Sequence, residues 1–100
     1  MAEPRLTLQG LKVLACFMQN PRRDISGADI ARETSLASGT LYPILIRFEQ
    51  AGWLGSDWED GQPAKLGRPK RRFYRITGAG QTAYNLSLAE FAPGSLSWAR

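Results

Sequence analysis

The sequence predicts a mainly α-helical domain with a small β-hairpin: three helices, a two-stranded hairpin and one further helix. Two observations lead to this fold class. Apolar residues recur at helical spacing in the N-terminal half and again after residue 77. Between these regions lie two short strand-like runs, which a long Gly- and Pro-containing stretch separates. A chain of 100 residues can bury one modest core, so we expect one domain.

The first helix is expected from Leu6 to Gln19, with Thr7 as a candidate N-cap. It ends at Asn20-Pro21, because the residue before a proline disfavours the helical conformation. The apolar surface is wide, which indicates burial on two sides. Either a second subunit covers one side, or the small domain wraps around the helix. The main stripe comprises Leu11, Leu14, Ala15 and Met18, and the second edge comprises Val13 and Phe17.

A helix-turn-helix is predicted between residues 26 and 52. After a short extended piece at Asp24-Ile25, Ser26 is the candidate N-cap of a short helix that runs to about Glu33. A four-residue turn leads to a longer helix that begins near Ser38 and stops at Ala51-Gly52. In a DNA-binding motif of this kind the second helix enters the major groove, whereas many small helical proteins contain two helices joined by four residues and bind no DNA. Its core face, at positions i, i+3, i+4 and i+7, consists of Leu41, Ile44, Leu45 and Phe48.

The outer face of this longer helix is suited to contact with a partner. Small residues at its start let the backbone approach closely, and the free N–H groups of a helix start suit an anion such as a phosphate. Because Pro43 would remove a helical hydrogen bond, we expect the regular helix to begin near Thr40 or to be distorted there. The candidate DNA-reading residues are Ser38, Gly39, Thr40, Tyr42 and Arg47.

The hairpin is expected to consist of strands over Trp53–Glu59 and Arg71–Thr77, joined by the loop Asp60–Lys70. In the second strand, Tyr74 and Ile76 should point inward. A helix-turn-helix followed directly by such a hairpin is the winged-helix plan.

The positive charge of the chain is concentrated in residues 61–75, which hold six basic and no acidic residues. The rest of the chain holds seven basic and nine acidic residues. Such a segment is typical of a surface that binds a polyanion, with a merely solvated loop as the alternative. The candidate wing contacts to DNA are Lys65, Arg68, Lys70, Arg71 and Arg72.

A last helix is expected from Gly78 to about Ala92, with Thr77 as its cap. It carries two apolar stripes, of which one can dock on the domain while the other needs a partner. We therefore expect residues 1–77 to form the DNA-binding domain, and residues 78–100 a dimerisation helix and tail. The expected stripes are Ala79, Ala83 and Leu86, and Tyr84, Leu88 and Phe91. The candidate homodimer interface comprises Leu11, Phe17, Tyr84, Leu88, Phe91 and Trp98.

Composition argues against several other functions. The chain has no histidine, so the commonest general base and the commonest metal ligand are missing, and we expect no enzyme, metal or cofactor. The single cysteine, Cys16, lies in an apolar helical pattern and is expected in the core, with a redox sensor as the alternative. No segment resembles a membrane span or a signal peptide, so a cytoplasmic location is expected. Trp53 and Trp58 are expected to be structural, whereas Trp98 is a candidate for a pocket that binds a small aromatic effector.

Three blocks of sequence resemble the PadR-type winged-helix transcriptional regulators. They are GTLYPILIRFEQAGWL at residues 39–54, Trp58-Glu59, and GRPKRRFYRIT at residues 67–77. The resemblance implies a dimeric DNA-binding repressor whose third helix reads operator DNA, whose wing contacts the backbone or an adjacent minor groove, and whose terminal helices pair. Many members release DNA on binding a small, often aromatic molecule. The HGYEI-like segment common in the family is replaced here by SGADI at residues 26–30, and the C-terminal region is short; these two departures weaken the expectation of an effector response.

The leading prediction is therefore a sequence-specific DNA-binding regulator, expected to act as a repressor on an inverted-repeat operator as a homodimer. The alternative is a winged-helix protein-interaction module whose basic wing binds an acidic protein partner. The small-residue helix start favours DNA, because an acidic protein would not require both this feature and the wing.

Overall fold

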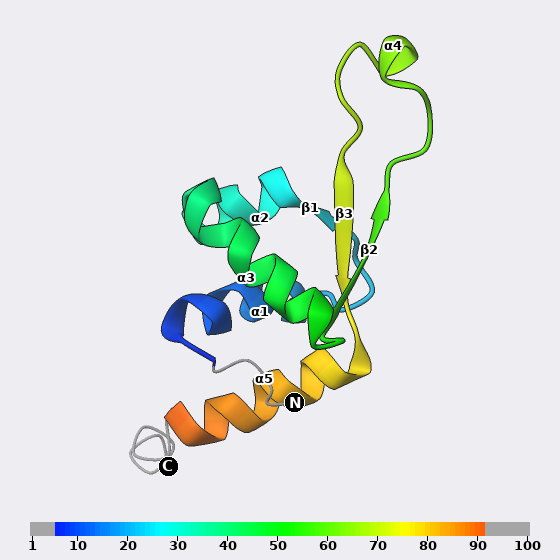
Figure 1. Ribbon diagram of the computed structural model, residues 1–100. Coiled ribbons are helices and arrows are strands. Elements are labelled where there is room, and N and C mark those ends of the chain that lie inside the picture. The colour runs from blue at the N-terminus through cyan, green and yellow to red at the C-terminus, as the bar shows by residue number, and fades with distance from the viewer. Residues whose placement is uncertain (1–5, 92–100) are drawn as a thin grey trace.

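The computed structural model describes residues 6–91, in which α-helices lie on one side and at the inner end of a three-stranded antiparallel sheet and a long hairpin projects beyond them (Figure 1). The elements are α1 (Leu8–Met18), β1 (Ile25–Ser26), α2 (Gly27–Thr34), α3 (Ser38–Gln50), β2 (Leu54–Trp58), α4 (Pro63–Leu66), β3 (Arg72–Ile76) and α5 (Gly78–Phe91). This order confirms the predicted fold class of a winged helix-turn-helix. The loop of the hairpin, expected to be irregular, contains the single turn of helix α4 at its tip.

The three predicted helix caps are confirmed. Thr7, Ser26 and Thr77 each accept a hydrogen bond, at 3.1 Å, from the backbone N–H three residues further along the chain. Each bond satisfies one of the N–H groups that a helix start leaves without a partner inside the helix. The caps fix where α1, α2 and α5 begin, and thereby the lengths of the connections between them.

Helix α3 is continuous from Ser38, so the expectation of a later start near Thr40 is wrong. Pro43 removes the hydrogen bond that would reach the carbonyl of Gly39. Gly39 is exposed, so solvent can satisfy this carbonyl, and the core face downstream holds the helix in place. The helix ends where predicted, and Gly52 adopts the left-handed conformation with a φ of 79°.

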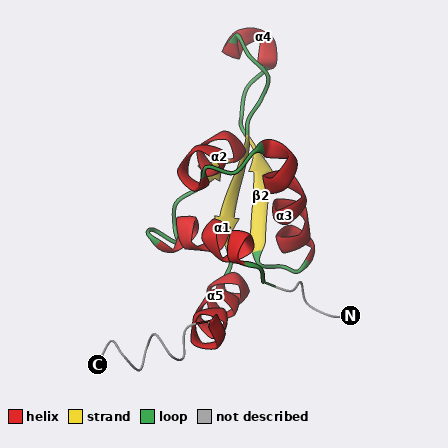
Figure 2. Ribbon diagram, turned by 90° about the vertical axis from the view of Figure 1, so that its left-hand side faces the viewer, coloured by secondary structure: helices red, strands yellow, loops and turns green. Residues whose placement is uncertain are grey.

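The sheet has the strand order β1-β3-β2, so the wing has a third, very short strand that the predicted two-stranded hairpin lacked. Ile25 lies opposite Tyr74 and Ser26 opposite Phe73 in the antiparallel ladder. Tyr74 and Ile76 are buried, as predicted. Figure 2 shows the strands with α2 and α3 on either side and α4 at the far tip. β1 therefore joins the start of α2 directly to the wing.

The core is formed by α1, α2, α3 and the inner end of the hairpin. The rings of Phe48 and Trp53 pack with their centroids 5.2 Å apart, which confirms a structural role for Trp53. Phe17 is 0% exposed in this core. The expectation that Phe17 lies at a dimer interface is therefore corrected: the second apolar edge of α1, Val13 and Phe17, is buried by the domain itself. Leu11, on the main stripe, keeps part of its surface.

Helix α5 docks through a face that differs from both predicted stripes. Its buried residues are Gly80 and Ser87, with Ala83 and Tyr84 partly buried against the core. A side chain at Gly80 would place its Cβ 2.2 Å from the carbonyl oxygen of Trp53, so only glycine permits this approach. Leu86, assigned to one stripe with Ala83, is 65% exposed. The side chain of Phe91 and all of Trp98 lie outside what the structure describes.

Candidate nucleic-acid interface

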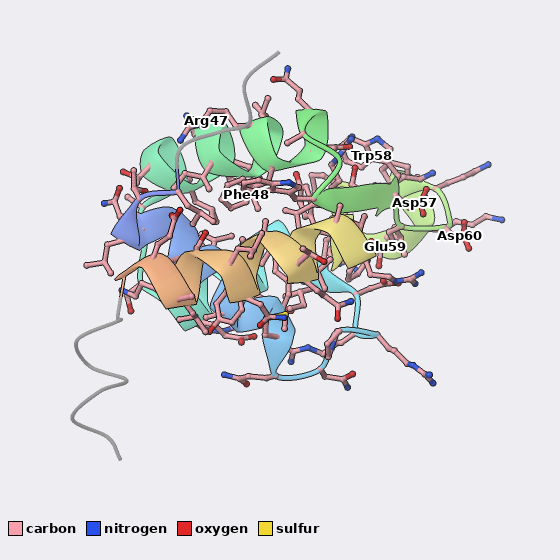
Figure 3. The ribbon with its side chains drawn as sticks, turned by 90° about the horizontal axis from the view of Figure 1, so that it is seen from below. Arg47, Phe48, Asp57, Trp58, Glu59 and Asp60 are labelled. Carbon is pink, nitrogen blue, oxygen red and sulfur yellow. The ribbon has the colours of Figure 1, made fainter. Side chains whose placement is uncertain are left out.

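The outer face of α3 is exposed along its whole length. Arg47 points away from the body of the domain, whereas its neighbour Phe48 points into it (Figure 3). The N-cap residue Ala37 offers no side-chain acceptor, so no capping side chain occupies the N–H groups at the start of the helix. Ser38 and Gly39 are exposed at this start, and Thr40 is partly buried. Ser38, Gly39, Tyr42 and Arg47 of the predicted reading residues are thus exposed in this structure.

Tyr42 lies across the start of α2. It is 40% exposed, and a Cβ at Gly27 would lie 2.6 Å from its hydroxyl oxygen. The absence of a side chain at Gly27 therefore lets this hydroxyl group reach the N-terminal turn of α2. Tyr42 faces the junction between α2 and the wing, which the sequence did not indicate.

A groove of about 510 Å³ lies between these helices and the wing. One wall is formed by Ser26, Gly27 and Tyr42, which contribute hydroxyl groups and the start of α2. The other wall comes from the hairpin. No acidic residue lines the groove, so its chemistry suits an anionic ligand. The basic residues that line it are Arg68, Lys70, Arg71 and Arg72.

Arg68 is held by a carboxylate of the same hairpin. Its Nη1 and Nη2 donate to Oε1 and Oε2 of Glu59 at 2.7 and 2.9 Å, a bidentate pair. The backbone N–H of Arg71 donates to Oε1 of Glu59 at 3.2 Å. The hydrogen bonds from Arg68 are the main reason why the pKa of Glu59 falls from 4.5 to about 2. This pair fastens the returning arm of the wing loop to the end of β2.

Arg72 connects the wing to the C-terminal end of α3. Its Nη2 donates to Oε2 of Glu49 at 3.1 Å and its Nε to Oγ of Ser56 at 3.0 Å. Ser56 Oγ donates in turn to the same Glu49 oxygen at 2.5 Å, which is the first cause of the lowered pKa of Glu49. The guanidinium lies 5.2 Å from the ring centre of Trp58, a cation–π contact. These contacts link the C-terminal end of α3 to the hairpin.

The charged segment therefore contains two groups of residues. The paired cations Arg68, Arg72 and Arg75 bind carboxylates from outside the segment, with Arg75 Nε 2.7 Å from Oδ1 of Asp24. The remaining three are the unpaired cations, which make no ion pair within residues 6–91 and are exposed. Sequence reasoning treated all of these charges alike and missed the acidic partners. The unpaired cations are Lys65, Lys70 and Arg71.

Cys16 belongs to the domain interior. Cys16 is 5% exposed and donates a hydrogen bond to Oε1 of Glu33 at 3.3 Å. Burial, with a smaller contribution from Glu33, raises the pKa of the Cys16 thiol to about 12. The thiol is therefore protonated at neutral pH, as expected for a core residue. Among the residues that the structure describes, no group of three His, Cys, Asp or Glu side chains could hold a metal, and no helix could cross a membrane.

Several solved structures share this architecture. The protein smu.1704 from Streptococcus mutans UA159 aligns with a TM-score of 0.71 at 25% identity, covering 95% of this chain and 86% of that one. A PadR family transcriptional regulator from Eggerthella lenta DSM 2243 aligns with a TM-score of 0.69 at 23% identity, covering 91% and 80%. A PadR-like transcription factor from Bacteroides fragilis aligns with a TM-score of 0.68 at 20% identity, covering 89% and 87%.

Sequence comparison gives the family. No curated protein matches the chain. The family model described as the transcriptional regulator PadR-like family matches residues 27–86, which run from the start of α2 through the wing and into α5. This region is more than half of the chain and includes all three blocks of the predicted resemblance. The chain belongs to the PadR-like family of transcriptional regulators.

Proposed function

We propose that this regulator is a sequence-specific DNA-binding repressor that acts in the cytoplasm as a homodimer on inverted-repeat operators. The observation that carries the proposal is the groove of about 510 Å³ beside the exposed face of α3, with four basic residues and no acidic one in its lining. A duplex offers both a backbone of phosphates for such a groove and base edges for the helix. A catalytic role has no comparable support.

Helix α3 would lie in the major groove. Arg47 is exposed and would bind a guanine through two hydrogen bonds or hold a phosphate. The residues at the helix start would bring the backbone close to the DNA, and the uncapped N–H groups there suit a phosphate. The proposed major-groove contacts are Ser38, Gly39, Thr40, Tyr42 and Arg47.

The wing would contact the DNA backbone through its unpaired cations. Lys65, Lys70 and Arg71 are exposed, so their charges are available to phosphates. Arg68 and Arg72 line the groove but are also bound to carboxylates. We propose that these two mainly hold the wing in shape and add to the field that attracts DNA.

A second copy of the chain would pair through α1 and α5. Leu88 is 38% exposed and Leu86 is 65% exposed on the outer side of α5, while Leu11 and Tyr84 are partly exposed. A symmetric dimer would bury these residues and present two reading helices to an inverted repeat. In this proposal residues 1–77 bind DNA, and residues 78–100 provide the dimer contact together with α1. Trp98 stays the candidate residue for a pocket that binds a small aromatic effector, and it lies outside the described residues.

Selection of bound sequences from a random duplex pool, followed by fluorescence anisotropy at several salt concentrations, tests the proposal. If each subunit neutralises about four phosphates, the slope of log affinity against log salt should be roughly −7. The selected sites should be inverted repeats. Binding that does not depend on salt, or a pool that yields no preferred sequence, would contradict the proposal. Binding of an acidic protein without binding of duplex DNA would favour the protein-interaction alternative.

A further inference from the structure

Ile46 is an apolar residue in the centre of the surface that we propose reads DNA. It is 54% exposed, whereas the neighbouring core residues Ile44 and Leu45 are 3% and 0% exposed. The core face of α3 is complete without it, since Leu41 and Phe48 fill the remaining positions. The domain therefore gains little from a large apolar side chain at position 46, and it is the place of Ile46 between Pro43 and Arg47 on the proposed DNA-reading surface that points to a role.

Ile46 belongs to a small apolar patch on a polar and basic surface. Pro43 is exposed three residues earlier, which places it on the same side of the helix. Arg47 is exposed next to Ile46. The nearest acidic residue on the helix, Glu49, is bound to Ser56 and Arg72. A surface of this charge favours nucleic acid over a second copy of the same basic surface.

We propose that Ile46, together with Pro43, contacts the C5-methyl group of a thymine in the major groove and so determines part of the sequence specificity. This inference rests on the proposed DNA binding. The thymine methyl group is the apolar feature among the base edges of the major groove, and apolar side chains are its partners. A β-branched side chain in a helix has essentially one rotamer, so Ile46 loses little freedom on contact. Arg47 would read a base close by.

The test removes the methyl group from the DNA. In a duplex selected by the wild-type protein, each thymine is replaced in turn by deoxyuridine, which lacks only the C5-methyl group, and affinity is measured by anisotropy. Loss of one buried methyl contact should weaken wild-type binding about fourfold at one thymine of each half-site. Ile46→Ala leaves only Pro43 and a shorter side chain near the methyl group, so it should lose most of this discrimination. Ile46→Val should keep most of the discrimination.

Arg71→Ala is the matched control, because we place Arg71 on a phosphate. It should weaken binding to the thymine and uracil duplexes by the same factor and leave their ratio unchanged. Ile46 is exposed, so thermal unfolding followed by circular dichroism should show that Ile46→Ala folds as the wild type does. A selected site at which no uracil substitution weakens binding would overturn the inference. So would an Ile46→Ala protein that keeps the full wild-type preference for thymine at the same position.

These results separate the inference from the proposed function. If the wild-type chain binds selected duplexes with a steep salt dependence but ignores the thymine methyl groups, DNA binding stands and the role of Ile46 is wrong. If it binds no duplex, the proposed function fails and the inference fails with it.

Discussion

The inner and outer ends of the β2–β3 hairpin use the same two strands for different purposes. At the inner end, Leu54 lies opposite Ile76, and these side chains are 2% and 4% exposed. At the outer end, Trp58 lies opposite Arg72, and Trp58 is 58% exposed. Burial holds the inner end, whereas ion pairs and hydrogen bonds shape the outer end.

This difference shows how a small domain can carry a long projecting wing. The apolar inner end packs against α5 and the core. Burial of its side chains stabilises the hairpin, and the free energy of this burial depends little on salt. Beyond it there is no core, so polar contacts must fix the geometry. Each of these contacts is individually weak at a surface. Changes at the inner end should therefore have the larger effect on folding, and changes to the unpaired cations of the outer end should alter binding.

The substitution Gly80→Ala should have the largest effect on stability. The new Cβ would lie 2.2 Å from the carbonyl oxygen of Trp53 and 2.8 Å from Ile76, so α5 would have to move off the inner end of the hairpin. We expect the free energy of unfolding to fall by about 3 kcal/mol, the upper part of the range for overpacking. Urea denaturation at a fixed protein concentration measures it.

Gly78→Ala is the control for this prediction. Gly78 lies on the same helix, and nothing lies within 4 Å of its potential Cβ. This change should leave the free energy of unfolding within about 0.5 kcal/mol of the wild-type value. Equal destabilisation by both alanines would show that α5 does not depend on close docking at Gly80.

Removal of the three unpaired cations should have the largest effect on binding. It should lower the affinity for DNA and leave the free energy of unfolding unchanged. In the triple variant Lys65→Ala, Lys70→Ala, Arg71→Ala, affinity for all duplexes at about 0.15 M salt should fall by roughly four orders of magnitude, because up to six phosphate contacts per dimer are lost. The slope of log affinity against log salt should become shallower by about 5. Anisotropy measures both quantities. An unchanged slope would show that these residues do not contact the backbone.

Most of the fold was predictable, because it depends on local patterns. The caps Thr7, Ser26 and Thr77 and the core face of α3 follow from residue type and spacing. The docked face of α5 was not predictable in this way. Its closest contact is Gly80, and it includes the polar Ser87, so hydrophobicity pointed to other residues.

The candidate site was predictable in its location but not in its internal contacts. The basic segment and the outer face of α3 are visible in the sequence. Which of the cations are paired depends on carboxylates far away in the chain: Arg72 binds Glu49, 23 residues earlier. The position of the Tyr42 hydroxyl likewise depends on Gly27, a residue of another helix. Such pairings arise only from the tertiary fold.

The neighbouring residues Arg71 and Arg72 allow the closest comparison within the wing. Arg72→Met leaves Glu49 and Ser56 without their cation and should lower the free energy of unfolding by about 1 kcal/mol, since both charged groups are about one third exposed. Its salt slope should stay near the wild-type value. Arg71→Met should leave the free energy of unfolding near the wild-type value and make the slope of log affinity against log salt shallower. Urea denaturation and salt titrations test both, and a shallower slope for Arg72→Met would place that residue on DNA.

The smallest expected effect concerns Glu59, whose pKa of about 2 lies below its ordinary value of 4.5 because of its bonds to Arg68. A pKa lowered in the folded state means that the pair contributes stability above pH 4.5, and that this contribution is lost as the pH falls toward 2. A titration of the Glu59 carboxyl carbon by NMR should give this low pKa. In Arg68→Ala the pKa should return most of the way to 4.5, but not completely, because the backbone N–H of Arg71 still donates to the carboxylate. A wild-type pKa near 4.5 would mean that Arg68 is not held by Glu59 and is free to join the unpaired cations on DNA.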